Sequence, residues 1–331
     1  MEFNFFTFIF LFAILTSVLA LLYLNFRQDK AIDNSFDEVP DGFSETIKLE
    51  DHQKAGKYTK AKLLLNHFEI IFSTIVLLVW TLGGAMNWID VYWSQRVIDP
   101  VFMGTFFILS IMLIASFIDL PFSIYRNFVL EQKFGFNRMT VKTFIGDFFI
   151  DIAQGIIFMV PLSYVILYLM NLEAIKDFWW IYVWIVFSLF ILTMSWIYPT
   201  FIATWKNKFT PLENSALKNR ITSLLDRTGF KSDGIFVMDG SKRSSHGNAY
   251  FTGIGKNKRI VFFDTLLKGM EDKEIEAILA HELGHFHYKH SRQRMINLFV
   301  SSFLSLASVS YTHLRAHETL MNLVCRLLLE K

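Results

Sequence analysis

Five apolar runs, each close to the length of one membrane-spanning helix, constrain the fold more than any other feature of this chain. They cover about 3–24, 68–88, 101–120, 148–170 and 178–202, and a sixth begins near Met295. A helix of about 20 apolar residues crosses the hydrocarbon core of a bilayer, where no water can satisfy an irregular backbone. The sequence therefore predicts a mainly α, multi-pass helical bundle whose first partner is the lipid bilayer.

The composition supports a membrane protein and excludes several other classes. Hydrophobic residues make up 53% of the 331 positions, and 36 of them are Phe. A soluble protein cannot hide so much apolar surface in one core. The net charge of only +2 gives no reason to expect a nucleic-acid partner. The single cysteine, Cys325, excludes an internal disulfide framework and a cluster of thiolate metal ligands.

The basic residues of the loops predict the orientation. The first apolar run lacks the basic start and the small-residue cleavage site of a signal peptide, so we expect a retained anchor. The second and fourth loops carry only Arg96 and Lys176, whereas the first and third are rich in Lys and Arg. Because cytoplasmic loops are enriched in these residues, the odd-numbered loops are predicted to be cytoplasmic. The membrane would be that of the endoplasmic reticulum in a eukaryote and the inner membrane in a bacterium.

Three acidic residues lie at or just inside the ends of the predicted spans, at Asp119, Asp147 and Asp151. Two interpretations stay open for them. They could lie at the interface between lipid and water. Alternatively, they could face a water-filled interior between helices, because an ionisable group in lipid is costly.

The segment 203–294 is the one stretch long enough for a soluble catalytic unit. Its patterns predict a helix at 212–228 ended by Gly229, and strands at 235–238, 245–252 and 259–263. A turn-rich stretch at 253–257 joins the last two strands, and a second helix follows. We therefore expect a cytoplasmic, zincin-like α/β segment. The polar stretch 28–57 is expected to be a flexible loop.

A histidine–glutamate motif dominates the second helix of this segment. The helical run 274–290 contains His281, Glu282 and His285, and its apolar residues recur with the helical period. Histidines four residues apart lie on one helix face, so both imidazoles can reach one tetrahedral zinc ion. Glu282 lies near the same ion, where it can act as general base toward the attacking water. One Zn²⁺ per chain is predicted.

Other histidines fit this metal site less well. His287 lies on the wrong helix face, and His290 lies nine residues after His281, not the ten of metzincins. His313 and His317 are four residues apart and stay a weaker alternative as ligands.

The stretch 244–251 is a candidate edge strand that could bind an extended peptide through its backbone. It could equally be a structural hairpin packed under the helix.

Several separate motifs resemble the integral-membrane zinc proteases of the Ste24 type, the CAAX prenyl protease 1 family. The resemblance covers about 1–305 and includes the span layout. It is carried by these motifs, which occur in the family's order: Asp119-Leu120-Pro121-Phe122, Phe128-Val129-Leu130-Glu131, Phe134-Gly135-Phe136-Asn137, Ser245-His246-Gly247-Asn248-Ala249-Tyr250-Phe251 and Leu279-Ala280-His281-Glu282-Leu283-Gly284-His285.

The resemblance implies a ring of seven membrane helices around a water-filled chamber, with the zinc site facing inward on the cytoplasmic side. It implies a metalloendopeptidase that cuts peptide or protein substrates near the C-terminus. In eukaryotic members, this cleavage removes the last three residues after a prenylated cysteine. His281 and His285 correspond to the zinc ligands and Glu282 to the base. Asn248 and Ala249 correspond to groups that hold the substrate backbone, and His246 corresponds to a position near the site.

The chain also departs from the family. The family takes its third zinc ligand from a glutamate on a downstream helix, and we find no counterpart here. We expect an N-terminal membrane region at 1–202, the metalloprotease segment at 203–294, the start of a sixth span at 295–309 and a foreign tail at 310–331. Because two protein ligands hold zinc weakly, a chain truncated in this way is expected to be a poor or inactive enzyme.

Two competing functions stay open at this stage. One is a quality-control metalloprotease for membrane proteins, with the same zinc chemistry and no preference for prenyl groups. The other is a non-catalytic membrane scaffold or truncated pseudoenzyme. Zinc content separates the second from a protease, and cleavage of prenylated against unprenylated peptides separates the two proteases.

Overall fold

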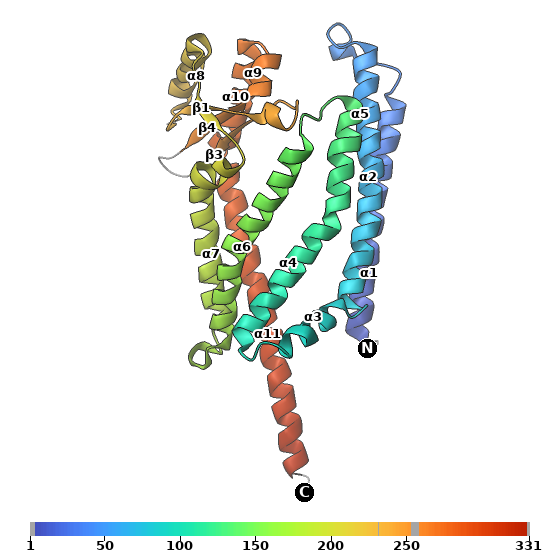
Figure 1. The fold of residues 1–331 in the computed structure, drawn as a ribbon, viewed down its shortest axis with the longest axis vertical. Coiled ribbons are helices and arrows are strands. Elements are labelled where there is room, and N and C mark those ends of the chain that lie inside the picture. The colour runs from blue at the N-terminus through green and yellow to red at the C-terminus, as the bar shows by residue number, and fades with distance from the viewer. Residues whose placement is uncertain (1–3, 231, 253–257, 330–331) are drawn as a thin grey trace. The chain divides into compact units, whose positions relative to one another are not determined.

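A computed structural model describes residues 4–230, 232–252 and 258–329 (Figure 1). The turn expected at 253–257 lies outside these residues, as do the side chains of Phe286, His313 and His317. Contacts within the chain divide it into two compact units, Met1–Ile98 with Ser110–Asn137 and Asp99–Leu109 with Arg138–Lys331.

Five helices among the described residues are long and apolar enough to cross a bilayer, which confirms the predicted mainly α membrane fold. At most 11% of the most apolar window of each is buried, so their apolar side chains face outward as lipid-exposed surfaces do. Their bounds, with the turns that continue the third and fifth, are Phe5–Asn34, Leu49–Thr81, Pro100–Phe134, Val141–Asn171 and Trp179–Trp205.

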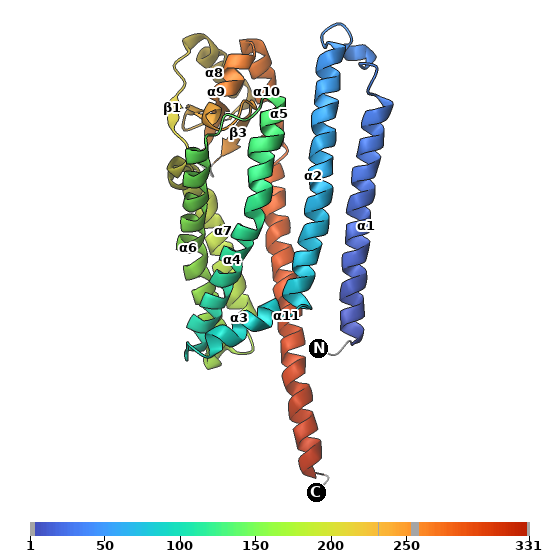
Figure 2. The ribbon, with the colours of Figure 1, turned by 45° about the vertical axis from the view of Figure 1, so that its right-hand side comes forward.

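The first unit begins with a helical hairpin of α1 (Phe5–Asn34) and α2 (Leu49–Thr81), seen side by side in both views (Figure 2). The expectation of a flexible loop at 28–57 is therefore wrong for most of its length. Lys60 explains why: its ammonium lies 2.6 Å from Asp33 and 3.5 Å from Asp29. These ion pairs between the two helices hold a polar segment in helical form.

The second predicted span ends earlier than expected. It was predicted to reach Trp88, but α2 ends at Thr81, and the separate helix α3 covers Ala85–Ser94. Gly84 lies between them with φ 81°, a left-handed conformation that glycine adopts without steric cost. The unit takes in α4 (Pro100–Ile124) from Ser110 onward, a π-helical turn at Tyr125–Glu131 and the short α5 (Gln132–Phe134).

The second unit contains a four-stranded mixed sheet in the order β1-β2-β4-β3. The central pair β2–β4 is parallel and the two outer pairs are antiparallel. The strands are β1 (Phe209–Pro211), β2 (Ile235–Met238), β3 (Ala249–Thr252) and β4 (Arg259–Phe263). The predicted bounds of β2 and β4 are confirmed, whereas β3 begins four residues later than predicted.

Three helices accompany this sheet: α9 (Asp264–Gly269) contacts β4, α10 (Asp272–His287) contacts β3, and α8 (Ser215–Thr228) packs against α10. Asn214 caps the start of α8 through its side chain, and Gly229 ends it with φ 66°. The core joins α8, β4 and α10 through apolar side chains that are at most 1% exposed: Leu217, Ile221, Ile260, Phe262, Ile275 and Leu279.

Membrane helices complete this unit. Helix α7 (Trp179–Ile197) lies beside both α6 (Val141–Asn171) and α11 (His290–Leu329) (Figures 1 and 2). The Trp184 indole on α7 donates a hydrogen bond of 3.0 Å to the carbonyl of Phe299 on α11. A buried indole N–H needs such a partner, so this bond fixes the two helices against each other.

The three acidic residues near the span ends have different surroundings. Asp147 and Asp151, both on α6, form ion pairs with Arg243 and Lys206. Asp119 lines a cavity of about 400 Å³ in the first unit, together with the ion pair Glu69–Arg126. Asp147 is therefore paired with a cation from outside the five membrane helices, and Asp151 with a cation directly after the end of the fifth.

Candidate metal centre

Helix α10 carries the metal-binding motif on the face opposite the core. Ile275, Leu279 and Leu283 are at most 4% exposed and bury one side of the helix. Acidic residues in the first turn favour helix formation because they complement the positive end of the helix dipole. A step of two residues is 200° around a helix, so burial of Leu279 and Leu283 turns His281 and His285 outward.

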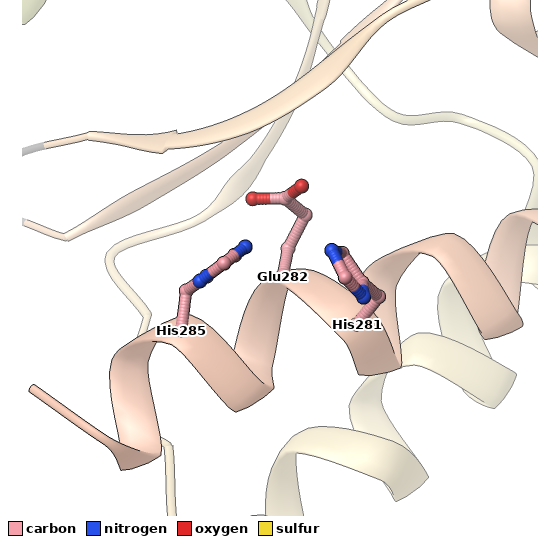
Figure 3. A group of neighbouring side chains, drawn as sticks. All are labelled: His281, Glu282 and His285. Carbon is pink, nitrogen blue, oxygen red and sulfur yellow. The ribbon is translucent and has the colours of Figure 1, made fainter. Parts of the chain in front are cut away.

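The structure brings His281, Glu282 and His285 together. Their potential ligand atoms all lie within 4.8 Å of one another. The two imidazole centroids are 4.9 Å apart, with the rings nearly perpendicular at 86°. Each imidazole turns one nitrogen toward the Glu282 carboxylate (Figure 3). Glu282 is partly buried and His281 is exposed, so the group is open to a ligand.

The chemistry of these donors fits a zinc ion. Imidazole nitrogens and a carboxylate oxygen are ligands that zinc accepts, and catalytic zinc sites leave one position open. Among the described residues, this is the group of three or more His, Cys, Asp or Glu residues whose ligand atoms come this close. The expected pairing of both histidines on one helix face is thus seen in the geometry.

His290 lies closer to this group than the sequence indicated. Its Nδ1 is 2.8 Å from the Nδ1 of His285. The helical run was expected to continue to His290, but α10 ends at His287 and α11 begins at His290. Lys289 between them has φ 56°. The separation of nine residues between His281 and His290 argues against His290 as a zinc ligand. It gives no sign of the contact between His290 and His285.

The candidate substrate strand β3 is an edge of the sheet and contacts α10. The Phe263 N–H donates to the Asn248 carbonyl at 2.9 Å, and this bond starts the ladder with β4. Because antiparallel bonding alternates, the backbone N–H and C=O of Ala249 and Phe251 point to the free edge. The Asn248 side-chain oxygen already accepts the Ala249 N–H at 2.9 Å.

His246 precedes β3 in a loop. Its carbonyl accepts a hydrogen bond of 2.8 Å from the Thr265 hydroxyl, and its side chain is not part of the group formed by His281, Glu282 and His285. The structure therefore brings three of the six expected site residues into one cluster, and it places Asn248 and Ala249 at the start of the adjacent edge strand.

Comparisons with known proteins agree with this geometry. The family profile "CAAX prenyl protease N-terminal, five membrane helices" matches residues 28–208, and the profile "Peptidase family M48" matches residues 211–328. The CAAX prenyl protease 1 homolog of Caenorhabditis elegans is 31% identical over 318 residues, 87% of this chain and 70% of the relative. This chain belongs to the CAAX prenyl protease 1 family of M48 peptidases.

Other members of the CAAX prenyl protease 1 family are similar over most of this chain. The Saccharomyces cerevisiae CAAX prenyl protease 1 is 36% identical over 293 residues, which are 85% of this chain and 63% of that protein. The Dictyostelium discoideum homolog is 35% identical over 284 residues, 83% of this chain and 65% of that protein. The chain thus spans a little under two thirds of the length of these two relatives.

The fold matches a solved member as well. The crystal structure of S. mikatae Ste24p aligns with a TM-score of 0.80 and 34% identity, covering 90% of this chain and 70% of that one. The chain is therefore a multi-pass membrane protein of the M48 metallopeptidases, a family of zinc enzymes. Its metal-binding motif and mixed sheet lie in the segment that the M48 profile covers.

Proposed function

We propose that this protein is a zinc metalloendopeptidase that cuts membrane-associated proteins near the C-terminus, including the removal of the last three residues after a prenylated cysteine. The observation that carries the proposal is the cluster of His281, Glu282 and His285, whose ligand atoms lie within 4.8 Å of one another. The name of the relatives, CAAX prenyl protease 1, supports the substrate class.

His281 and His285 would hold the metal through their imidazoles. Bound zinc would act as a Lewis acid that polarises the scissile carbonyl and lowers the pKa of water toward about 7. A catalytic zinc site has three protein ligands. His281 and His285 supply two of these, and the third, which the family resemblance assigns to a glutamate on a downstream helix, has no counterpart identified in this chain.

Glu282 performs the proton transfers in this proposal. Its carboxylate faces the space between the two imidazoles (Figure 3). There it accepts a proton from the water whose oxygen attacks the carbonyl carbon. When the C–N bond breaks, the same carboxyl group donates that proton to the departing amine. The carboxylate is thereby restored at the end of each turnover.

Strand β3 would hold the substrate in an extended conformation beside this carboxylate. Its free edge offers the backbone carbonyls of Ala249 and Phe251 and the N–H of Phe251, whereas the Ala249 N–H is bonded to the Asn248 side chain, and β3 packs against α10. A peptide added as a further strand gains main-chain hydrogen bonds that do not depend on its side chains. His246, in the loop before β3, is assigned a substrate contact near this site.

The basic first and third loops support a cytoplasmic position for the catalytic segment. The orientation is tested by adding a protease to sealed vesicles and measuring whether it cuts the 203–294 segment. In vesicles with the cytoplasmic face outward, the added protease should cut this protein within the 203–294 segment. Protection in those vesicles, together with cleavage in inverted ones, contradicts the orientation.

The chemistry is tested by measuring bound zinc and peptide cleavage on the purified full-length protein. Glu282→Gln should retain about one zinc and lose at least about 10³-fold in kcat, because only the base is removed. His281→Ala should lose the metal as well. A metal-free wild-type protein without peptidase activity would instead favour a scaffold.

Substrate class is tested separately with two matched peptides that differ only in a farnesyl group on the cysteine. Preferential cleavage of the farnesylated peptide supports prenyl specificity. Equal kcat/KM values for the two peptides would leave the metalloprotease chemistry standing and favour a quality-control protease.

A further inference from the structure

A hydrogen bond between two histidines lies next to the metal-binding motif. The Nδ1 atoms of His285 and His290 are 2.8 Å apart. Two imidazole nitrogens at this distance share one hydrogen, so one donates and the other accepts. Both Nδ1 atoms are therefore used in this contact. The nitrogen of His285 that remains for a metal is Nε2.

The backbone brings these rings together at one residue. In a continuous helix, residues five apart lie 140° from each other around the axis, so the side chains of His285 and His290 would point away from each other. Lys289 prevents this continuation. Its φ of 56° makes it the one non-glycine residue with positive φ among the described residues. A left-handed conformation is unfavourable for a residue that carries a Cβ.

The ring of His290 has a second aromatic neighbour. Tyr288 stacks on it, with centroids 5.8 Å apart and an interplanar angle of 19°. The His285 and His290 centroids are 5.1 Å apart. A strained backbone residue and a stacked aromatic ring thus converge on one imidazole, and that imidazole contacts a residue of the metal-binding motif.

We propose that His290 is a positioning residue for the metal site. Its Nδ1 accepts the hydrogen of the His285 Nδ1–H, which fixes the His285 tautomer that leaves Nε2 free for the metal and holds the ring in place. Ligating histidines use their second nitrogen in this way, and loss of such partners weakens metal binding about 10- to 100-fold. The inference rests on the proposed function for the metal itself.

His290 acts as a partner of a ligand in this arrangement and not as a ligand. It is absent from the group whose ligand atoms lie within 4.8 Å. Its Nδ1 is engaged with His285, and His285 would hold a zinc ion through Nε2, the ring nitrogen that is not bonded to His290. Removal of His290 should therefore weaken the site without abolishing it.

The test is the zinc dissociation constant of the full-length protein, measured by competition with a chelator. His290→Ala should raise this constant about 10- to 100-fold. His290→Asn should recover most of the affinity, because the Asn side-chain oxygen can accept the same hydrogen. His287→Ala is the matched control: His287 is exposed at the same helix end, and its ring contacts Tyr288. It should leave the constant unchanged.

A second pair of variants tests the backbone. Lys289→Gly should keep zinc affinity, because glycine adopts positive φ freely. Lys289→Ile should weaken it as His290→Ala does, because a β-branched residue disfavours this conformation. Thermal unfolding of the metal-free variants, compared with the metal-free wild type, separates loss of the site from loss of the fold.

The outcomes distinguish this inference from the proposed function. A wild type that binds no zinc overturns both. A wild type that binds zinc, with His290→Ala unchanged, overturns only the positioning role. Complete loss of zinc in His290→Ala and His290→Asn alike also overturns it, because that result makes His290 a ligand.

Discussion

The Arg243 guanidinium donates two parallel hydrogen bonds to the Asp147 carboxylate, from Nε to Oδ2 at 2.6 Å and from Nη2 to Oδ1 at 2.7 Å. Its other bonds go to the Asn207 side chain at 2.9 Å and the Lys206 carbonyl at 2.8 Å. Both charged side chains are mostly buried, at 17% and 15% exposure. One arginine therefore ties the loop before β3 to the beginning of α6.

Arg243→Met should destabilise the detergent-solubilised protein by about 3–5 kcal/mol, because it leaves Asp147 without its partner in a poorly solvated place. Arg243→Lys should cost less, since the charge stays but the two-pronged geometry is lost. Thermal unfolding measures both. Lys176→Met removes an exposed ion pair with Glu173 and should leave the unfolding temperature nearly unchanged, because water screens a pair on the surface. Equal losses for Lys176→Met and Arg243→Met would contradict this account.

Asp264 should make the soluble segment sensitive to acid. Partial burial raises the pKa of its carboxyl group, but hydrogen bonds from the Ser241 hydroxyl and N–H outweigh burial, so the pKa lies below its ordinary value. A carboxylate with a depressed pKa stabilises the fold above its unfolded-state pKa of about 3.9, and this contribution is lost as pH falls through the folded pKa.

Asp264→Asn should therefore cost about 1–2 kcal/mol at neutral pH and progressively less below about pH 4. The measurement is the unfolding midpoint of wild type and variant across this range. Ser241→Ala should reproduce part of the effect, because it removes one of the two donors. Stability curves that stay parallel from pH 7 to pH 3 would count against the role of Asp264.

Local patterns were sufficient for several elements around the sheet. The bounds of β2 and β4, and the end of α8 at Gly229, follow from residue type over a few positions. The same holds for the pairing of His281 with His285, because a separation of four residues alone places both on one helix face.

Features that depend on contacts distant in sequence could not be predicted. Residues 28–34 of the polar stretch belong to α1 and residues 49–57 to α2, and Lys60 of α2 reaches back to Asp33 of α1; no pattern within 28–57 indicates that pairing. The helix break at Lys289 was missed for a related reason. Lysine is a good helix former, so only the tertiary structure, with His290 drawn to His285, reveals the left-handed residue.

Removal of the metal should lower the stability of the protein as well as abolish its activity. Zinc that binds only the folded chain adds about 2.7 kcal/mol when its free concentration is 100 times Kd. Wild type should therefore unfold at a lower temperature after chelation and recover on addition of zinc. His285→Ala should show neither response. A chelator that shifts wild type and His285→Ala alike would point to a metal site elsewhere.

Phe251 offers the sharpest test of the edge strand as the substrate site. Its backbone N–H points to the free edge, while its ring packs 5.0 Å from that of Phe230. Proline is tolerated where the N–H of an edge strand is not part of the ladder. Phe251→Pro therefore removes one donor to the substrate together with the ring, whereas Phe251→Ala removes the ring alone.

One backbone hydrogen bond contributes about 1 kcal/mol. KM should therefore be about 3- to 10-fold higher for Phe251→Pro than for Phe251→Ala, with similar zinc content. Equal KM values for the two variants would show that the substrate does not pair with β3 at this position.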